Sequence, residues 1–238
     1  MKNLLLSALI VFCFIQPGHS QLQGGKSGFY AGLSYSLAFF TDPDVSNVYP
    51  SFDFRRNALK SEINPYIGYK PSEQIAFEFS PGFLYSNSTA GDGFYYSQTG
   101  LSSDMYYYYP RNAYLLSIPF NFKMKVFPFS AAKSLAVSGI FFSVAGGPIM
   151  IKEEYDIDIY ENENMFQVIG YRSAVDNIIW TGDMQLSIGY MTQSVLALGF
   201  EAGYRFVPLP VDRKYPLASS IAANMNTVLV SVKFGYNF

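Results

Sequence analysis

The last fifteen residues of the chain, 224–238, place an apolar side chain at almost every second position. The apolar set is Val228, Val230, Val232, Phe234, Tyr236 and Phe238, and the positions between them are mostly small, polar or charged. Because side chains alternate across a strand, this pattern predicts a strand with one continuous apolar face. Its aromatic residues gather toward the end of the sequence. Such an apolar edge is unfavourable in water but is typical of the last strand of a lipid-facing barrel.

The same alternation recurs in seven earlier segments. They are 29–39, 62–69, 75–85, 114–126, 135–150, 180–190 and 196–206. The segment 135–150 is apolar on both faces, and we expect Ile140, Phe142 and Val144 to form its outer set. Pro65, Pro81 and Pro119 fall inside strand patterns, where proline is disfavoured, and we interpret them as bulge or rim positions.

The connections alternate between short and long. The short ones are 70–74, 127–134 and 191–194, and the long ones are 41–61, 86–112, 151–177 and 207–223. Short turns on one side and long loops on the other are typical of bacterial outer-membrane barrels. The sequence therefore predicts an all-β fold, an eight-stranded antiparallel up-and-down transmembrane β-barrel with both termini in the periplasm.

The first twenty residues have the pattern of an export signal. Lys2 is followed by an apolar run over 4–15 and then by small residues at Gly18 and Ser20. The apolar run is too short to span a bilayer as a helix. We therefore expect a signal peptide over 1–20, a short linker over 21–27 and the barrel over 28–238. Cys13 follows large apolar residues rather than small ones, so a lipid anchor on it is not expected.

Composition excludes several classes of function. Cleavage before Gln21 removes the only cysteine and the only histidine, so neither a zinc site of the usual kind nor an imidazole base is expected. We predict no enzyme activity, no metal and no cofactor, although serine–lysine or aspartate-only chemistry stays formally open. The net charge of −2 argues against nucleic-acid binding. Charged residues make up only 14% of the chain and aromatic residues 18%, a poor fit to a soluble globule.

A soluble eight-stranded barrel would place its large apolar residues inside. Here the predicted apolar face carries aromatic residues near most strand ends. They are Phe39, Tyr85, Tyr114, Trp180 and Phe206 at one rim, and Phe29, Tyr69, Tyr190 and Tyr236 at the other. Two aromatic belts mark the headgroup levels of a bilayer. The opposite face is rich in Gly, Ser, Ala, Asn and charge, which predicts a narrow polar lumen in a membrane barrel.

The charges on the inward face are the best candidate site. The acidic residues are Glu62, Glu78, Asp183 and Glu201, and the basic residues are Lys123, Lys125, Arg205 and Lys233. Their heights on neighbouring strands predict the pairs Glu78–Lys123 and Glu201–Lys233. Paired charges would close the lumen, whereas unpaired ones would line a gated pore. Because an eight-stranded barrel holds little more than its own side chains, the closed lumen is the favoured interpretation.

Two loop segments are candidates for surface contacts. Four consecutive tyrosines, Tyr106, Tyr107, Tyr108 and Tyr109, have the composition of a contact surface, or else pack on the rim of their own barrel. The acidic segment 153–164 resembles one strand of a hairpin that extends above the membrane and returns over 165–171. Its acids would either hold Ca²⁺ or Mg²⁺ against lipopolysaccharide or remain solvated, and we favour the solvated hairpin.

Three stretches carry a family resemblance: YLLSIPFNFKMKVFP (114–128), SGIFFSVAGGPIM (138–150) and LALGFEAGYRF (196–206). With the final KFGYNF, they resemble the porin-family outer-membrane β-barrel domain, a relative of the small OmpA/OmpX-type barrels. The resemblance implies that Phe238, with Phe234 and Tyr236, is the signal read by the barrel-assembly machinery. It implies contact with outer-membrane lipid and lipopolysaccharide, and names no ligand. We expect a monomer with an envelope-structural or adhesion role, and a narrow pore for small or hydrophobic solutes is the alternative.

Overall fold

Strands make up nearly all of the chain that the structure describes. The computed structural model describes residues 27–42, 45–46, 49, 52–53, 58–88, 94–97, 105–132, 135–160, 168–209 and 224–238. The strands are β1 (Gly28–Phe40), β2 (Phe52–Asp53), β3 (Ala58–Leu59), β4 (Ser61–Lys70), β5 (Ile75–Pro81), β6 (Phe83–Ser88), β7 (Phe94–Ser97), β8 (Met105–Val126), β9 (Ile140–Tyr160), β10 (Val168–Met191), β11 (Leu196–Phe206) and β12 (Thr227–Asn237). A short helix, α3 (Leu135–Ser138), lies between β8 and β9.

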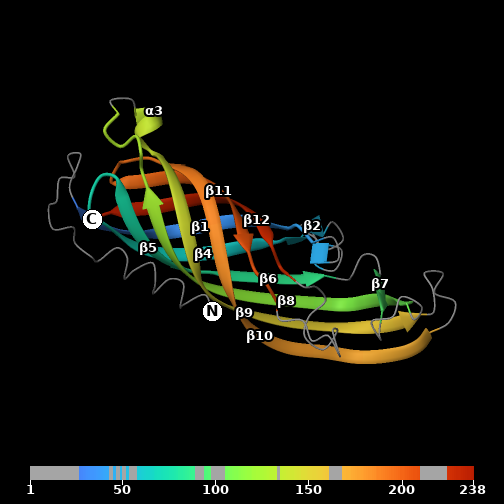
Figure 1. Cartoon of the computed structure of the whole chain (residues 1–238). Helices are drawn as coiled ribbons and strands as arrows, with labels where there is room; N and C mark the ends of the chain where they lie inside the picture. Colours follow the sequence, from blue (N-terminus) through green and yellow to red (C-terminus); the bar gives the residue numbers. More distant parts are fainter. Residues whose placement is uncertain are drawn as a thin grey trace.

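The strands close into an antiparallel barrel (Figure 1). β12 pairs with β11 on one side and with β1 on the other, and the second edge of β1 pairs with β4. β5 and β6 together form one wall strand, which is interrupted at Gly82. In the described residues the wall therefore has eight strands, in the order β1-β12-β11-β10-β9-β8-β5/β6-β4. The predicted all-β, eight-stranded antiparallel fold is confirmed.

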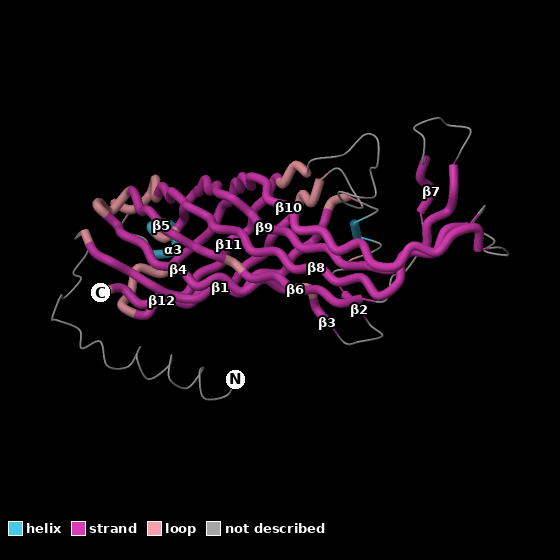
Figure 2. The backbone as a smooth tube through the Cα atoms, turned by 90° about the horizontal axis from the view of Figure 1, so that it is seen from below, coloured by secondary structure: helices cyan, strands magenta, loops and turns pink. Residues whose placement is uncertain are grey.

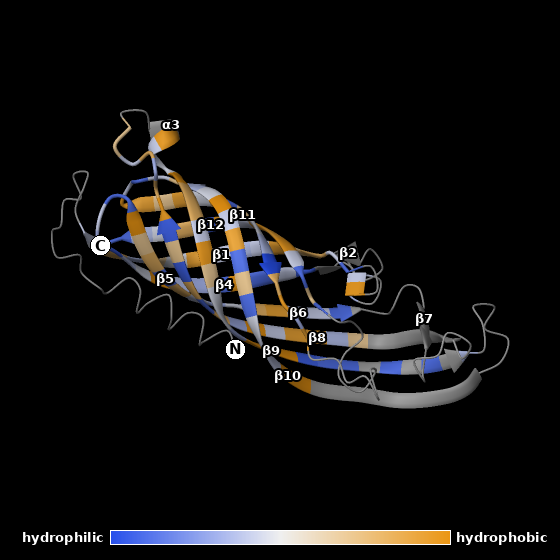
Figure 3. Cartoon of the chain, in the orientation of Figure 1, coloured by the Kyte–Doolittle hydropathy of each residue, from blue (hydrophilic) through white to orange (hydrophobic). Residues whose placement is uncertain are grey.

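Apolar side chains face outward and polar ones inward along most of the wall. On β12, Val228 and Val230 are exposed, whereas Ser231 and Lys233 are buried. Figure 3 shows the resulting apolar bands on the barrel surface. A barrel of this kind is suited to lipid and not to water. In water it would expose large apolar side chains and would also bury charged groups, and both are unfavourable. No helix in the described residues has the length and apolar character needed to cross a bilayer.

The bounds of several strands differ from the prediction. Residues 135–138 form α3, so the expected strand over 135–150 begins only at Ile140, although Phe142 and Val144 are exposed as predicted. The expected long loops over 86–112 and 151–177 are partly strand, because β8 begins at Met105, β9 runs to Tyr160 and β10 begins at Val168.

These extra residues form a sheet that continues beyond the barrel (Figure 2). β11 pairs with β10 only from Met184 onward, so the outer part of β10 pairs with β9 alone among the described residues. β7 pairs with the outer part of β8. The predicted pairing of the acidic segment with a returning strand is confirmed for β9 and β10, and the pair is longer than the acidic segment indicated.

Proline explains the interruption of the wall between β5 and β6. The ladder of β4 pairs Ile67 with Phe79 and Ile63 with Phe83, so Pro65 lies opposite Pro81. Neither proline has an N–H group, and the ladder is interrupted at this point. The N–H of Gly82 instead donates to the carbonyl of Pro119 at 2.8 Å. The prolines therefore mark a break in the middle of the wall and not its rim.

Candidate functional site

Five inward charges form one network, here called the lysine network: Glu78, Lys123, Lys125, Glu201 and Lys233. The ammonium of Lys233 bridges both carboxylates, at 3.1 Å from Glu78 Oε1 and 2.8 Å from Glu201 Oε2. Lys125 donates to Glu78 Oε2, and Lys123 Nζ lies 2.6 Å from Glu201 Oε1. The members come from β5, β8, β11 and β12, so the network joins opposite walls of the barrel.

Hydroxyl groups and aromatic rings complete the lysine network. Ser187 and Ser143 donate to Glu201 Oε1 at 2.5 and 3.2 Å. The rings of Tyr30, Tyr66 and Phe141 surround the ammonium of Lys125, with centroids 5.4, 5.6 and 5.2 Å away. Buried charge is tolerated when it is paired and hydrogen-bonded, and cations are also stabilised by ring faces.

A second group of polar side chains, here called the Arg205 cluster, contains Glu62, Asn64, Asn121, Asp183 and Arg205. The guanidinium of Arg205 binds Glu62 with two nitrogens, at 2.5 and 2.8 Å, and its Nε lies 3.3 Å from Asp183 Oδ2. Asn64 Nδ2 donates to Glu62 Oε1 at 2.7 Å. This bidentate geometry is the strongest form of a carboxylate–guanidinium contact.

Gly147 brings two members of the Arg205 cluster together. It lies on β9 between Asn121 of β8 and Asp183 of β10 in the strand register, and it has no side chain to separate them. A Cβ atom at Gly147 would lie 2.0 Å from the carbonyl oxygen of Phe120. The backbone of β8 therefore approaches β9 closely at this point, which only glycine permits.

The structure places all eight of the predicted inward charges in the lumen, each almost fully buried. The predicted pair Glu201–Lys233 is present. The predicted pair Glu78–Lys123 is wrong: the two residues lie opposite each other on β5 and β8, but Lys123 pairs with Glu201 and Glu78 pairs with Lys125 and Lys233. Strand register gives the height of a side chain, whereas a long lysine chain can reach across a narrow lumen.

Apolar side chains fill the lumen at the end that carries the short turns. The set is Tyr30, Tyr66, Ala76, Phe127, Phe141, Met191 and Ala197. Tyr66 also donates from its hydroxyl to the carbonyl of Phe234 at 3.0 Å, which ties β4 to β12 over the intervening strand β1. The lysine network is therefore covered by aromatic side chains on this side.

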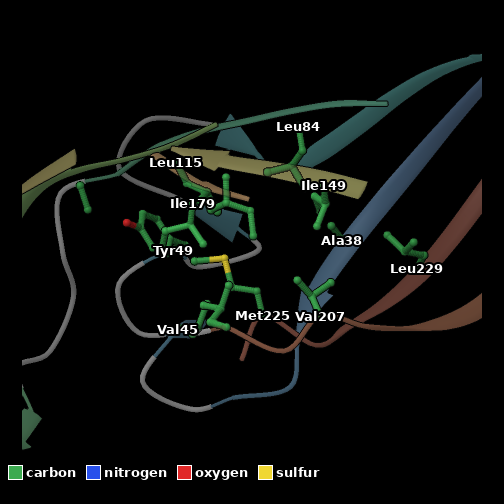
Figure 4. Close-up of a cluster of buried hydrophobic side chains, with 13 residues drawn as sticks. Ala38, Val45, Tyr49, Leu84, Leu115, Ile149, Ile179, Val207, Met225 and Leu229 are labelled. Atoms are coloured by element: carbon green, nitrogen blue, oxygen red, sulfur yellow. The ribbon is translucent and has the colours of Figure 1, made fainter. Parts of the chain in front are cut away.

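A second apolar cluster, here called the apolar cap, fills the lumen toward the long-loop end (Figure 4). Its members are Ala38, Val45, Tyr49, Leu84, Ala113, Leu115, Ile149, Ile151, Ile179, Val207, Leu209, Met225 and Leu229. Val45 and Tyr49 come from the segment between β1 and β2, and both are fully buried. The tyrosine hydroxyl donates to Glu153 Oε1 at 3.3 Å, and Lys60 donates to the Tyr49 carbonyl.

The apolar cap corrects the predicted polar lumen. The polar interpretation holds for the middle of the barrel but is wrong near the long loops, where the inward side chains are apolar. The sequence could have indicated this apolar region through Leu115, Ile149 and Ile151, because these residues lie at inward positions of otherwise alternating strands. Val45, Tyr49 and Met225 had no periodic signal, since they lie outside the barrel strands.

The predicted surface residues lie in the sheet beyond the barrel. The backbone of Tyr106–Tyr109 belongs to β8, where Tyr106 is opposite Tyr96, and Tyr107 is opposite both Tyr95 and Tyr160. Of the acidic segment, Glu153 and Asp158 are buried, whereas exposed Glu154 lies 3.6 Å from Lys152. In the part of the chain that the structure describes, no group of three or more acidic, histidine or cysteine side chains is arranged to hold a metal ion.

The predicted assembly residues lie at the end of β12. Phe234 faces outward and is exposed, and the rings of Tyr236 and Phe238 are in edge contact with centroids 5.1 Å apart. The N–H of Phe238 donates to the carbonyl of Phe29 at 2.9 Å, which continues the seam between the first and last strands.

The fold and the lumen together define a class: a small eight-stranded transmembrane β-barrel with a lumen filled by its own side chains. No protein-family model matches the chain, and no curated protein matches it.

Solved structures of small outer-membrane barrels are similar at low identity. Ail, the attachment invasion locus protein of Yersinia pestis, in complex with the heparin analogue sucrose octasulfate, is 10% identical over 91% of this chain and 100% of that chain, with a TM-score of 0.40. The N-terminal β-barrel domain of Pseudomonas aeruginosa OprF is 10% identical over 90% of this chain and 100% of that domain (TM-score 0.39). Neisserial surface protein A is 10% identical over 90% and 98% (TM-score 0.37). At this level of similarity the structures bear on neither ligand nor role.

Proposed function

We propose that this chain is a non-enzymatic outer-membrane barrel whose closed body anchors a surface-exposed sheet, with an envelope-structural or adhesive role. The observation that supports this proposal is that side chains fill the lumen. Aromatic side chains around Tyr66 cover one end, the two charged groups fill the middle, and the apolar cap fills the other end. Water and ions in a continuous path would have to displace all three layers.

The long sheet supports a surface role. β8, β9 and β10 extend well past the barrel, and their length is not needed to cross a bilayer, for which about 9–11 residues per strand are enough. Short turns lie at the opposite end, together with the start of β1 and the end of β12. In outer-membrane barrels short turns are periplasmic, so we propose that the long sheet faces the cell exterior and that both termini face the periplasm.

Planar-bilayer recording of the refolded protein tests the closed lumen. The wild type should show no steady conductance, or only brief openings. Lys233→Ala should increase the frequency of openings because it removes the ammonium between Glu78 and Glu201, whereas Lys152→Ala, in an exposed ion pair, should not. A large, steady wild-type conductance that Lys233→Ala barely alters would instead support the narrow pore.

Surface attachment tests the adhesive role separately. Cells that carry the wild-type barrel should be retained on protein-coated surfaces better than cells without it. Replacing Tyr106–Tyr109 with serine should reduce retention, provided that the amount of folded, heat-modifiable barrel is unchanged. Equal retention of all three strains would leave only the envelope-structural role.

A further inference from the structure

The lumen ends in a small pocket beside the short turns. Its walls are the start of β1, the turn after β4, the end of β8, the turn after β10 and the end of β12. Four of its lining residues, Tyr30, Ala76, Phe127 and Met191, belong to the apolar set that covers the lysine network. The pocket has a volume of about 80 Å³. It therefore belongs to the end of the lumen and not to the outer wall of the barrel.

The polar side chains of the turn after β10 are held by contacts within the rim. Gln193 Nε2 donates to the carbonyl of Ser138 at 2.8 Å, and Asn237 Nδ2 donates to the carbonyl of Ser194. The hydroxyl of Ser194 lies 3.3 Å from that of Thr192. These groups fix the shape of the rim, and the body of the pocket is mostly apolar.

The two charged side chains at the rim also interact with each other. The ammonium of Lys70 lies 4.8 Å from the centroid of the Phe127 ring, and Glu73 is close enough to interact with the charge of Lys70. Opposite charges at this distance screen each other for a ligand in the pocket. The rim of the pocket is therefore close to neutral, and it selects no ligand by charge.

Lys125 is the charged residue at the inner end of the pocket. It lies opposite Ala76 in the strand register, and it is only 1% exposed. An ammonium group has three N–H donors, but in the described residues Glu78 is the one oxygen partner of Lys125. Aromatic rings surround the rest of the ammonium, and the ring of Tyr30 is both one of them and part of the pocket wall. Donors of Lys125 are thus available to an oxygen that enters past Tyr30.

The charges around Lys125 do not balance. The lysine network contains three ammonium groups and two carboxylates, and Lys125 shares Glu78 with Lys233. The Arg205 cluster has the opposite excess, two carboxylates and one guanidinium. It lies farther from the pocket, because its member on β8, Asn121, is farther than Lys125 from the short turn that follows this strand. One negative charge in the pocket would give the lysine network as many negative groups as positive ones.

We propose that the pocket binds a small monocarboxylate with an apolar chain. The carboxylate accepts hydrogen bonds from Lys125, and the chain lies against Phe127 and Met191. A cavity of about 150 Å³ holds one benzene molecule, so this pocket encloses the carboxylate and roughly two to four carbons, and a longer chain extends past the rim. A dianion would exceed the one surplus charge and a cation would be repelled by Lys125, so charge complementarity selects a monovalent anion.

NMR of the refolded barrel with isotope-labelled methionine methyl groups tests this site, with hexanoate as the probe. Met191 lines the pocket, whereas Met225 lies in the apolar cap and Met184 is exposed on the outer wall. Hexanoate should shift the Met191 signal saturably and leave the Met225 signal unchanged. It should bind at least about tenfold more tightly than hexanol, which has the same chain but no charge for Lys125.

Three results of this titration would overturn the proposal. The first is a Met191 signal that does not move. The second is equal affinity for hexanoate and hexanol, which would show that Lys125 does not bind the carboxylate. The third is a shift of Met184 as large as that of Met191, because hexanoate would then have entered only the detergent around the outer wall.

Variants locate the carboxylate within the pocket. Lys125→Met keeps a side chain of similar length without the charge, and it should weaken hexanoate binding to the level of hexanol. Lys70→Gln, at the rim, should bind hexanoate like the wild type, as should Lys152→Ala in its exposed ion pair. Ala76→Leu narrows the pocket and should weaken the binding of both probes. Loss of binding in Lys70→Gln together with full binding in Lys125→Met would place the carboxylate at the rim and overturn the proposal.

The heat-modifiable gel shift of each variant checks that the barrel is folded. If Lys125→Met does not fold, hexylammonium on the wild type decides, because a cation with the same chain should leave Met191 unshifted at concentrations where hexanoate saturates. A Met191 shift with hexylammonium equal to that with hexanoate would overturn the proposal. The titrations measure neither conductance nor surface attachment, so failure of the carboxylate site and failure of the proposed function give different results.

Discussion

The Nζ of Lys233 lies 2.8 Å from Oε2 of Glu201, its diagonal neighbour on the adjacent strand of the barrel wall. The same nitrogen also contacts Glu78 on the far side of the lumen, at 3.1 Å. Lys233 therefore connects the last strand, β12, to β11 and to β5. Strands that are distant in sequence are held together at this point by one ammonium group.

Replacing Lys233 with alanine should destabilise the barrel. It removes the only ammonium that bridges both carboxylates in the described lumen, and breaking a buried ion pair costs about 3–5 kcal/mol. Lys125 and Lys123 remain beside Glu78 and Glu201. We therefore expect the free energy of unfolding to fall by an amount near or below the lower end of this range. Urea titration of the folded barrel, followed by tryptophan fluorescence, measures it.

Lys152→Ala is the matched control for Lys233→Ala. Its ammonium lies 3.6 Å from Glu154 in an exposed pair, and such pairs contribute about 0–1 kcal/mol. If Lys233→Ala lowered the free energy of unfolding no more than Lys152→Ala does, the lysine network would not stabilise the barrel.

Processing should remove residues 1–20 and leave Gln21 as the first residue. The basic start, the short apolar run and the small residues at Gly18 and Ser20 predict this cleavage. Intact mass of protein isolated from the outer membrane gives the answer directly. A mass that retains Met1, or that includes acyl chains on Cys13, would contradict the signal-peptide assignment.

Replacing Phe238 with aspartate should reduce insertion of the barrel while synthesis and export continue. The side chain continues the aromatic end of β12, and its N–H closes the seam to Phe29 at 2.9 Å. The fraction of heat-modifiable barrel in outer-membrane preparations measures insertion. Phe129→Asp, at an exposed aromatic position in a short turn, is the control. Normal insertion of the Phe238 variant would exclude an assembly role for this residue.

The barrel wall is predictable from sequence because its signal has a period of two and extends over whole strands. Phe142 and Val144 face outward as their spacing predicted, even in a segment that is apolar on both faces. The inward charges are predictable for the same reason, since Glu78 and Lys233 occupy the polar positions of alternating strands. Their partners are predictable only in part: Lys233 contacts Glu201 on the adjacent strand as expected, whereas Glu78 does not pair with Lys123. Alternation gives the strand and the height of a charge, but not the direction in which a long side chain crosses the lumen.

The apolar cap could not be predicted by alternation alone. Tyr49 and Met225 reach the lumen from segments without a periodic pattern, and they are buried only because the surrounding strands leave space for them. The sheet beyond the barrel was underestimated for a different reason. Polar and aromatic residues such as those near Tyr107 are typical of loops, but backbone pairing with β9 keeps them in strand conformation.

The buried Lys60 should make the stability of the apolar cap depend on pH. Lys60 lies just before β4, its ammonium donates to the Tyr49 carbonyl, and it lies 4.2 Å from the Phe40 ring centroid. Burial lowers the pKa of Lys60 to about 7, whereas an exposed lysine titrates near 10.4. Between these values the unfolded chain binds more protons than the folded chain, so the free energy of unfolding should rise with pH from about 7 to about 10.

The rise is at most about 1.4 kcal/mol per pH unit, because only one proton is involved. Other lysines and tyrosines titrate in the same range, so the measured quantity is the difference between the wild type and Lys60→Met in urea titrations at pH 7, 8, 9 and 10. Methionine keeps an apolar chain of similar length over Phe40 and has no proton to lose. The difference should move in favour of the wild type as pH rises, because the cost of burying the ammonium is relieved. A difference that stays constant over this range would show that Lys60 remains exposed to water and does not belong to the closed cap.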